Sequence, residues 1–407
     1  MGRRPSKEYP LRCLHLQSTA DAAEILKRIE VDPYGIEAML TKMVHVNILV
    51  EGVECKIANI IKQEMLSIGG DAAVSRNSVS CCAKETDIVI MGTVKQIHRF
   101  VNKMSIQPFG LVDIAQAIKQ LLANISKSHF TLKTYHRELS IGDRTRIMGI
   151  LNVTPDSFSD GGRYRSPEDA IEQGQKMVDD GADILDVGGE SARPGSEPVS
   201  AEEEMTRVMP VIKGLAIRVN VPISVDTTKA EVAREAIEYG AEIVNDISAM
   251  TFDEKMPSVV AGAKAAVILM HMRGKPRDMQ KGNLFYKSVR GDVIAYLKKR
   301  MEDAHAAGIL PESVMVDPGF GFGKTGEDNL RMLKYLGEFK VLGRPIVAGV
   351  SRKAFIGRIT GGDPLEREEG TAAAVTAAIM KGANIIRVHD VRSMKKVLAM
   401  ADAILRA

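Results

Sequence analysis

The stretch Pro222–Asp246, PISVDTTKAEVAREAIEYGAEIVND, contains the repeating unit of most of this chain. A short apolar run ends in Asp226, a segment with apolar residues at helical spacing follows, and a second apolar run ends in Asn245 and Asp246. Alternation of short β-branched runs with longer helical patterns predicts parallel β/α units.

The same alternation extends from about residue 146 to the C-terminus. We count eight apolar runs, each of which ends in or is directly followed by a polar or small residue: Ile147–Val153, Ala182–Gly188, Pro222–Asp226, Glu242–Asp246, Ala265–His271, Val314–Asp317, Pro345–Val350 and Asn384–His389. Segments such as Ala170–Val178 and Met205–Ile217 have helical periodicity. A doubly wound sheet would show the same alternation, but eight units in about 260 residues match a (β/α)₈ barrel better.

The first 138 residues have a different pattern. Three predicted strands, Leu11–Gln17, Val46–Val50 and Asp87–Met91, are separated by segments with helical spacing. We therefore predict an α+β accessory domain over residues 1–138, whose role the sequence does not indicate, and the barrel over residues 139–407. The segment Lys127–Ser140 is the predicted connection.

Composition excludes several classes of protein. Of the 407 residues, 45% are hydrophobic and 26% charged, and the net charge is +3, as in an ordinary globular protein without a polyanion-binding patch. No signal peptide or apolar stretch long enough to cross a bilayer is visible, so a cytoplasmic protein that binds neither nucleic acid nor membrane is expected. The four cysteines include the adjacent pair Cys81 and Cys82, but they lack the spacing of a metal or redox motif, and we assign them no function.

Polar side chains stand where the predicted strands end. They are Asn152, Asp186, Asp226, Asn245 with Asp246, His271, Asp317, Ser351 to Lys353, and Arg387 with His389. Each could simply cap the following helix, but in a barrel all eight positions meet at the carboxyl-end mouth. Carboxylates and amides there suit the edge of an amino-pyrimidinone ring, or alternatively a divalent metal. The cationic residues favour a ligand with an anionic part.

Two kinds of glycine-rich segment accompany these strand ends. TPDSFSDGGRYR (Thr154–Arg165) and GGESARPGSEPV (Gly188–Val199) are predicted mobile loops that cover the mouth. GFGFGKTG (Gly319–Gly326) is not a phosphate-binding Walker loop, because Pro318 occupies the position of its first glycine. We interpret it as a loop that approaches the ligand closely.

The ordered motifs of residues 146–405 resemble those of the dihydropteroate synthases. They are MGILNVTPDSFSDGG (148–162), DVGGESARPG (186–195), SVDTTK (224–229), VNDI (244–247), LMHMRG (269–274), DPGFGFGK (317–324), GVSRK (349–353) and RVHD (387–390). The resemblance implies that this chain joins 6-hydroxymethyl-7,8-dihydropterin pyrophosphate to 4-aminobenzoate in folate biosynthesis, giving 7,8-dihydropteroate and pyrophosphate. It also implies a homodimer and the cofactor Mg²⁺.

The resemblance assigns roles to individual residues. The implied pterin-pocket residues are Asp226, Asn245, Ile247, Met270, Asp317, Phe322 and Lys353. The implied pyrophosphate-binding residues are Asn152, Arg387 and His389, with Asn152 also the magnesium ligand; these three and Lys353 are the implied catalytic residues. The implied aminobenzoate pocket and covering loops comprise Phe158, Ala192, Arg193, Pro194 and Ser351. Ala192 departs from the family, which usually has threonine there, so the contact to the arylamine must differ.

Two other functions share parts of this pattern. The pterin-binding barrel of corrinoid-dependent methyltransferases has the Asp/Asn ring pocket, but it lacks the GVSRK and second-loop RPG segments present here. A non-catalytic pterin-binding paralogue would not need Asn152, Lys353, Arg387 and His389. The resemblance implies a reaction driven by departure of pyrophosphate, which needs no strong protein base; the absence of an evident Cys/His or Ser/His pair agrees with this.

Overall fold

A computed structural model describes residues 10–16, 18–79, 84–108, 110–154, 166–193 and 195–407. The chain divides into two compact units, Met1–Leu122 and Ala123–Ala407. The predicted functional residues Phe158 and Pro194, and the pair Cys81 and Cys82, lie outside the described residues.

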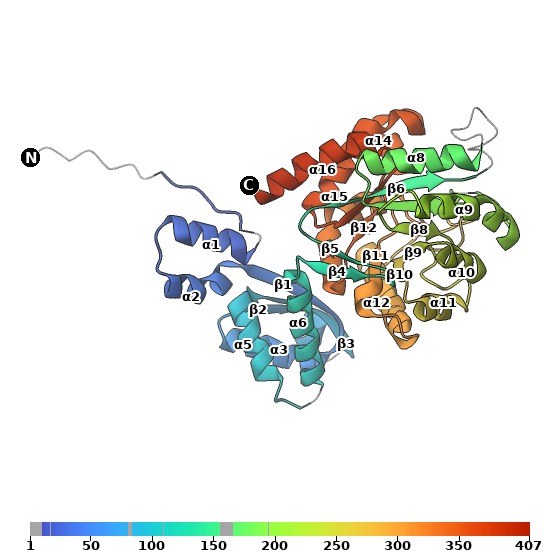
Figure 1. The fold of residues 1–407 in the computed structure, drawn as a ribbon. Helices are drawn as coiled ribbons and strands as arrows, with labels where there is room; N and C mark the ends of the chain where they lie inside the picture. Colours follow the sequence, from blue (N-terminus) through green and yellow to red (C-terminus); the bar gives the residue numbers. More distant parts are fainter. Residues whose placement is uncertain (1–9, 17, 80–83, 109, 155–165, 194) are drawn as a thin grey trace, which may run out of the picture. The chain divides into compact units, whose positions relative to one another are not determined.

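The second unit is the predicted barrel (Figure 1). Its eight parallel strands are β6 (Arg146–Asn152), β7 (Ile184–Gly188), β8 (Ile223–Asp226), β9 (Ala241–Asp246), β10 (Ala266–Met270), β11 (Val314–Asp317), β12 (Val347–Ala348) and β13 (Ile385–Val388). Each strand pairs with its sequence neighbour, and β13 pairs with β6. A parallel bridge between Val316 and Ile346 joins β11 to β12 and closes the ring, which excludes the open doubly wound sheet.

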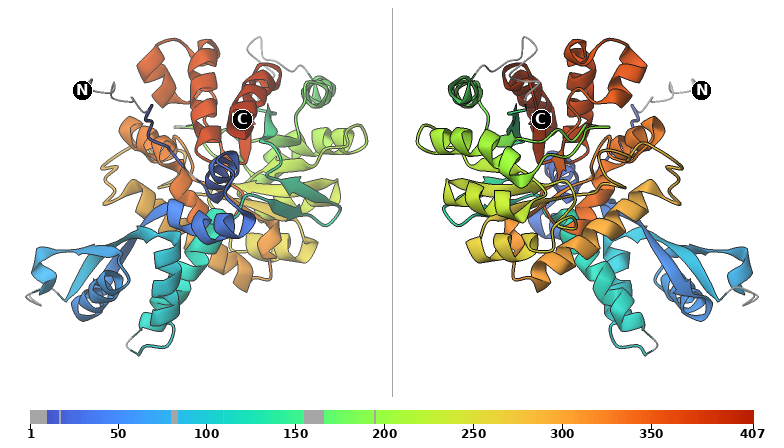
Figure 2. Two further views of the ribbon diagram at one scale, coloured as in Figure 1. Left: turned by 90° about the vertical axis from the view of Figure 1, so that its left-hand side faces the viewer. Right: turned by 90° about the vertical axis from the view of Figure 1, so that its right-hand side faces the viewer.

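Helices surround the strands, as the two views of Figure 2 show. They are α8 (Pro167–Asp179), α9 (Ala201–Ala216), α10 (Ala230–Glu238), α11 (Met256–Ala263), α12 (Val289–Ala306), α13 (Gly326–Lys334), α14 (Ala354–Thr360), α15 (Glu368–Met380) and α16 (Val391–Arg406). Side chains such as Leu151, Val187 and Val225 point outward from the strands into the core between strands and helices. The eight predicted strands and the (β/α)₈ class are confirmed.

A two-stranded hairpin belongs to the barrel unit. β4 (Phe130–Lys133) pairs with β5 (Glu138–Ile141) within the segment predicted as a connection. Leu132 and Ile141 are fully buried against the inward-facing residues at the amino ends of the barrel strands, Met148 and Ile184 among them. The division between the units therefore precedes the predicted boundary after residue 138, because the hairpin covers the end of the barrel opposite the mouth.

The first unit is an α+β fold, as predicted. Its elements are α1 (Thr19–Arg28), α2 (Pro33–Met43), β1 (His45–Glu54), α3 (Cys55–Ser67), β2 (Asp71–Val74), α4 (Arg76–Val79), β3 (Glu85–Thr93) and α5 (Val94–Met104), followed by α6 (Leu111–Ser126), which runs across the division. The antiparallel sheet has the order β1-β3-β2, and α3 and α5 pack on it. The strand predicted for Leu11–Gln17 is wrong over Leu11–Leu16, which adopt no regular structure.

Candidate active site

Four neighbouring strands align polar groups at the carboxyl end of the barrel. In the strand pairing, Asn152 on β6 is opposite Gly188 on β7, Gly188 is opposite Asp226 on β8, and Asp226 is opposite Asn245 on β9. Gly188 lacks a side chain, and a Cβ there would lie 3.8 Å from Oδ1 of Asn152 and 3.7 Å from Oδ2 of Asp226. The amide and the carboxylate therefore border one open position at the mouth.

Arg387 crosses the mouth from β13. Its Nε donates to Oδ2 of Asp186 at 2.6 Å, and its Nη2 donates to Oδ2 of Asp226 at 2.7 Å. Asn245 also donates to Oδ2 of Asp186, at 3.0 Å. Asp186 is fully buried, and its Oδ1 has no hydrogen-bond partner among the described residues. Arg387 thus pairs with both carboxylates and orients Asp226.

Burial and the neighbouring charges shift the pKa values of Asp226 and Arg387. Burial raises the pKa of Asp226 to about 7; the positive charge of Arg387 opposes the change, and the negative charge of Asp186 adds to it. For Arg387, burial alone lowers the pKa, but the charges of Asp186 and Asp226 raise it overall, so the guanidinium stays protonated. Asp226 therefore changes charge near neutral pH while its partner does not.

Asp317 and Lys353 lie at the opposite side of the mouth. Oδ1 of Asp317 accepts a hydrogen bond from the backbone N–H of Gly319 at 2.7 Å, and burial raises the pKa of this carboxyl. The Nζ of Lys353 lies 4.3 Å from the ring centroid of Phe322, in a cation–π contact. Burial and the charge of Arg387 lower the pKa of Lys353 to about 8, although Asp317 opposes them.

The polar side chains of the mouth, here called the polar floor, are Asp226, Asn245, Asp317, Lys353 and Arg387. An apolar wall lies beside them. Its buried members are Ile247, Met270, Met272, Met279 and Phe322. Ala192 packs against them and belongs to the loop that follows β7, here called the second loop. A flat heterocycle between a hydrogen-bonding floor and apolar side chains is the arrangement expected of a small-molecule site. Met272 and Met279 were not predicted, because an apolar residue in a long loop has no periodicity that would reveal it.

The loop Gly319–Lys324 is held by its own lysine. The Nζ of Lys324, fully enclosed, donates to backbone oxygens of Gly319 (2.9 Å), Phe322 (3.1 Å) and His271 (3.2 Å), and lies 2.8 Å from Nδ1 of His271. A Cβ at Gly319, whose φ is +72°, would lie 1.9 Å from the oxygen of His271, so only glycine fits. This close approach joins the loop to the segment after β10, while Phe322 of the same loop lies in the apolar wall of the site.

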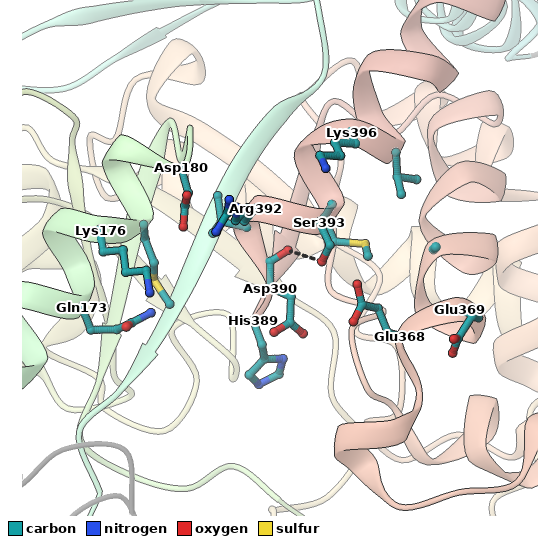
Figure 3. A pocket seen from close by; sticks show the side chains of 15 residues that line it. Gln173, Lys176, Asp180, Glu368, Glu369, His389, Asp390, Arg392, Ser393 and Lys396 are labelled. Carbon is teal, nitrogen blue, oxygen red and sulfur yellow. Dashed lines mark hydrogen bonds between the residues drawn. The ribbon is translucent and has the colours of Figure 1, made fainter.

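His389 and Ser351 pair at the rim. Their Nδ1 and Oγ atoms are 3.0 Å apart. His389 also lines a groove of about 840 Å³ to which α8, α15 and α16 contribute side chains. Figure 3 shows the cations Lys176, Arg392 and Lys396 there together with several carboxylates, so the groove has no single sign of charge.

The structure therefore brings most of the predicted site residues to one mouth. The polar group comprises Asn152, Asp226, Asn245, Asp317, Lys353 and Arg387, and the apolar group comprises Ile247, Met270 and Phe322. Ala192 contacts the apolar wall, Ser351 and His389 lie at the rim, and Arg193 is exposed. From the sequence, Asp186 was noted as polar but was assigned no role. Residues two positions apart in a strand lie on the same face, so Asp186 faces the inside of the barrel together with Gly188.

A metal would have few protein ligands here. No group of three or more His, Cys, Asp or Glu side chains in the described part of the chain could hold a metal ion. Magnesium commonly binds through one or two protein oxygens, water and substrate phosphates. The amide oxygen of Asn152 at the mouth fits that mode of binding.

The comparisons with known proteins agree with this site. Residues 148–389 match the model of a family described as "Pterin binding enzyme". The dihydropteroate synthase of Synechocystis sp. is 49% identical over 267 residues, which are 65% of this chain and 92% of that protein. The crystal structure of Yersinia pestis dihydropteroate synthase with a sulfonamide drug complex superimposes with a TM-score of 0.65 at 39% identity, covering 68% of this chain and all of that one.

Two further matches are informative. The Xanthomonas albilineans dihydropteroate synthase with 4-aminobenzoic acid has a TM-score of 0.64 at 41% identity, covering 69% of this chain and 99% of that one. A probable bifunctional folylpolyglutamate synthase/dihydropteroate synthase of Halobacterium salinarum is 39% identical over 95% of this chain, which spans 46% of that protein. That match includes most of the N-terminal unit. The family match covers more than half of the chain, and the chain belongs to the pterin-binding enzymes, in their dihydropteroate synthase group.

Proposed function

We propose that the barrel is a transferase that condenses 6-hydroxymethyl-7,8-dihydropterin pyrophosphate with 4-aminobenzoate, releasing 7,8-dihydropteroate and pyrophosphate. The observation that carries this function is the single mouth in which Asp226, Asn245, Asp317, Lys353 and Arg387 converge beside an apolar wall. Sequence identity of 44–49% to dihydropteroate synthases over nearly their whole length supports it.

The pterin ring is assigned to the polar floor. Asp317 and the second oxygen of Asp226 accept hydrogen bonds from the amino-pyrimidinone edge, and Asn245 offers its amide oxygen and its remaining N–H. Lys353, protonated below its pKa of about 8, donates to an acceptor of the ring. The charges of the carboxylates and of Lys353 strengthen these hydrogen bonds.

The arylamine is assigned to the space beside Lys353 and Phe322, under the second loop. Because Ala192 contributes only a methyl group against the apolar wall, binding there depends more on apolar contact than it would with threonine. The nitrogen of the arylamine attacks the exocyclic methylene carbon of the pterin as the carbon–oxygen bond to pyrophosphate breaks. The amine proton leaves to solvent or pyrophosphate, so no protein base is needed.

Asn152, Arg387 and His389 are assigned to the pyrophosphate side. A magnesium ion held by Asn152 and by substrate oxygens would neutralise charge on the leaving group. Arg387 stays protonated beside Asp186 and Asp226, and His389 is oriented by Ser351. The homodimer is proposed from the family resemblance, and the cytoplasmic location from the N-terminal sequence pattern. Among the described residues, no helix is long and apolar enough to span a membrane.

Pyrophosphate release tests the function. Purified protein is mixed with the pterin pyrophosphate, 4-aminobenzoate and magnesium, and pyrophosphate and dihydropteroate are followed together. Lys353→Ala and Asp317→Asn are expected to lower turnover by about tenfold or more. Pterin binding without turnover by any arylamine would favour the non-catalytic paralogue, and methyl transfer from a methylpterin would favour the corrinoid-linked function.

A further inference from the structure

A cluster of three charged side chains lies beside the mouth and has no part in the assignments above. The Nζ of Lys229 donates to carboxylate oxygens of both Glu190 and Glu204. Glu204 is fully buried, whereas the side chains of Lys229 and Glu190 are 23% and 24% exposed. The three residues come from the start of α10, the loop after β7 and α9, so one ammonium group joins three segments.

The cluster is coupled to both halves of the site by short lengths of chain. Lys229 follows Asp226 by three residues, and that turn is stiff: the N–H of Thr227 donates to the backbone oxygen of Asn245 at 3.1 Å, and the N–H of Lys229 donates to Oγ1 of Thr227 at 3.2 Å. Glu190 precedes Ala192 by two residues, and Ala192 packs on the apolar wall. Lys229 therefore links the floor under the pterin to the loop over the arylamine.

The same residues border a pocket of about 310 Å³. Its lining includes Asp226, Ile247, Ala192, Lys229 and Glu190. Because this pocket lies between the second loop and the segment after β8, apolar side chains do not fill the space between the two segments. Polar anchors must then fix the position of Ala192 relative to Asp226.

The other anchors of the second loop act elsewhere. Arg207 on α9 donates to the backbone oxygen of Gly189 at 2.7 Å, before the loop turns. At the tip, the N–H of Gly195 donates to the oxygen of Pro276 at 3.0 Å. The ion pair of Glu197 with Arg277 is long (3.5 Å) and mostly exposed, so it contributes little. Between these two points, among the described residues, Lys229 is the side chain that connects the second loop to the segment after β8, through its contact with Glu190.

The cluster holds one positive and two negative charges, which is not the arrangement expected of a contact that serves only to stabilise the fold. One ammonium faces two carboxylates, and Oε1 of Glu204 is buried without a hydrogen-bond partner among the described residues. Burial raises the pKa of Glu204 while Lys229 opposes the rise, and the two carboxylates raise the pKa of Lys229 against the effect of its own burial. Buried ion pairs are weak evidence for stability, and in some proteins they impose a particular geometry instead.

We propose that Lys229 is a positioning residue for the arylamine half of the reaction. By holding Glu190 and Glu204 it keeps residues 188–193 of the second loop in register with Asp226, so that the arylamine meets the pterin methylene at the correct distance. This inference rests on the proposed function. Displacement of a reacting group by about 1 Å can cost up to about a hundredfold in rate.

Steady-state kinetics with each substrate varied in turn tests the proposal. Lys229→Met is expected to lower kcat and to raise KM for 4-aminobenzoate, so that kcat/KM for this substrate falls by about tenfold, and to change KM for the pterin pyrophosphate by less than about twofold. Lys229→Arg, which keeps the charge and the donors, is expected to stay within about threefold of the wild type. Lys299→Met is the matched control, because it removes a lysine–carboxylate pair with Asp303 that is exposed on α12.

A double variant separates positioning from stability. Lys229→Met alone leaves Glu204 buried and unpaired, so the protein loses stability; adding Glu204→Gln removes that charge and is expected to restore the urea midpoint while KM for the arylamine stays high. Recovery of KM together with stability would overturn the proposal. So would equal changes in KM for both substrates, or no change with Lys229→Met. A wild type that turns over no arylamine overturns the proposed function and this inference with it.

Discussion

The Nε of Arg387 on β13 lies 2.6 Å from Oδ2 of Asp186 on β7, although the two residues are 201 positions apart in the chain. Strand β6 lies between their strands in the sheet, so the guanidinium reaches across the inside of the barrel. The same guanidinium binds Asp226, the carboxylate assigned to the pterin. Arg387 therefore supports both the fold of the mouth and the charge of the binding site.

Replacing Arg387 by methionine should destabilise the protein. It leaves Asp186 and Asp226 facing each other without a counter-charge, and breaking a buried pair costs about 3–5 kcal/mol. Urea denaturation measures the loss. Combining Arg387→Met with Asp186→Asn should recover part of it, while an unchanged midpoint in the single variant would show that the two contacts contribute nothing.

The pH dependence of kcat/KM for the pterin should be bell-shaped. The pKa of Asp226 is raised to about 7, so the ionised form that accepts ring N–H groups predominates above that pH and declines below it. The pKa of Lys353 is lowered to about 8, so its donor form is lost above that pH. The maximum is expected between these values. Lys353→Met should remove the alkaline limb, and a flat profile from pH 6 to 9 in the wild type would contradict the assignment.

Lys324→Met should loosen the loop that carries Phe322. The substitution leaves the oxygens of Gly319, Phe322 and His271 buried without their donor, at a cost of about 1–3 kcal/mol for an unsatisfied group. Urea denaturation and KM for the arylamine are the measurements. Lys334→Met, an exposed lysine on α13, serves as the control; equal behaviour of the two variants would refute the role of Lys324.

Ala192→Thr tests the departure from the usual family sequence. The hydroxyl adds a hydrogen-bonding group at the edge of the apolar wall, worth about 0.5–1.5 kcal/mol if it reaches the arylamine. KM for 4-aminobenzoate should then fall by about two- to tenfold, with KM for the pterin unchanged. Ala192→Ser, with a hydroxyl but no methyl group, isolates the contribution of the hydrogen bond. A rise in KM with threonine would mean that the wall has no room for it.

Two truncated chains should behave differently. A chain that begins at Ala123 retains the hairpin β4–β5 and should fold, whereas one that begins after residue 138 loses Leu132 and half of the hairpin. Exposing one buried leucine position and its packed neighbours costs about 1.5–3 kcal/mol for each large side chain. Circular dichroism melting compares the two. Equal melting temperatures would show that the hairpin is dispensable.

The barrel and its chemical class could be read from local patterns. Each of the eight apolar runs overlaps one strand, and β7, β8, β9 and β11 end at the predicted residue. Because side chains alternate along a strand, the position of Asp226 or Asn245 in its run also fixes that it faces inward. The polar mouth was therefore predictable as a group of residues.

Only the tertiary structure decided which of those residues touch. The pairing of Arg387 with Asp186, and of Lys229 with Glu190 and Glu204, depends on closure of the ring and on helices that return beside it. Leu11–Leu16 has the composition of a strand but forms none, and the hairpin at residues 130–141 looked like a connection. The physical reason is that periodicity reports which face of a segment is buried, whereas contacts between distant segments follow from where the whole chain places them.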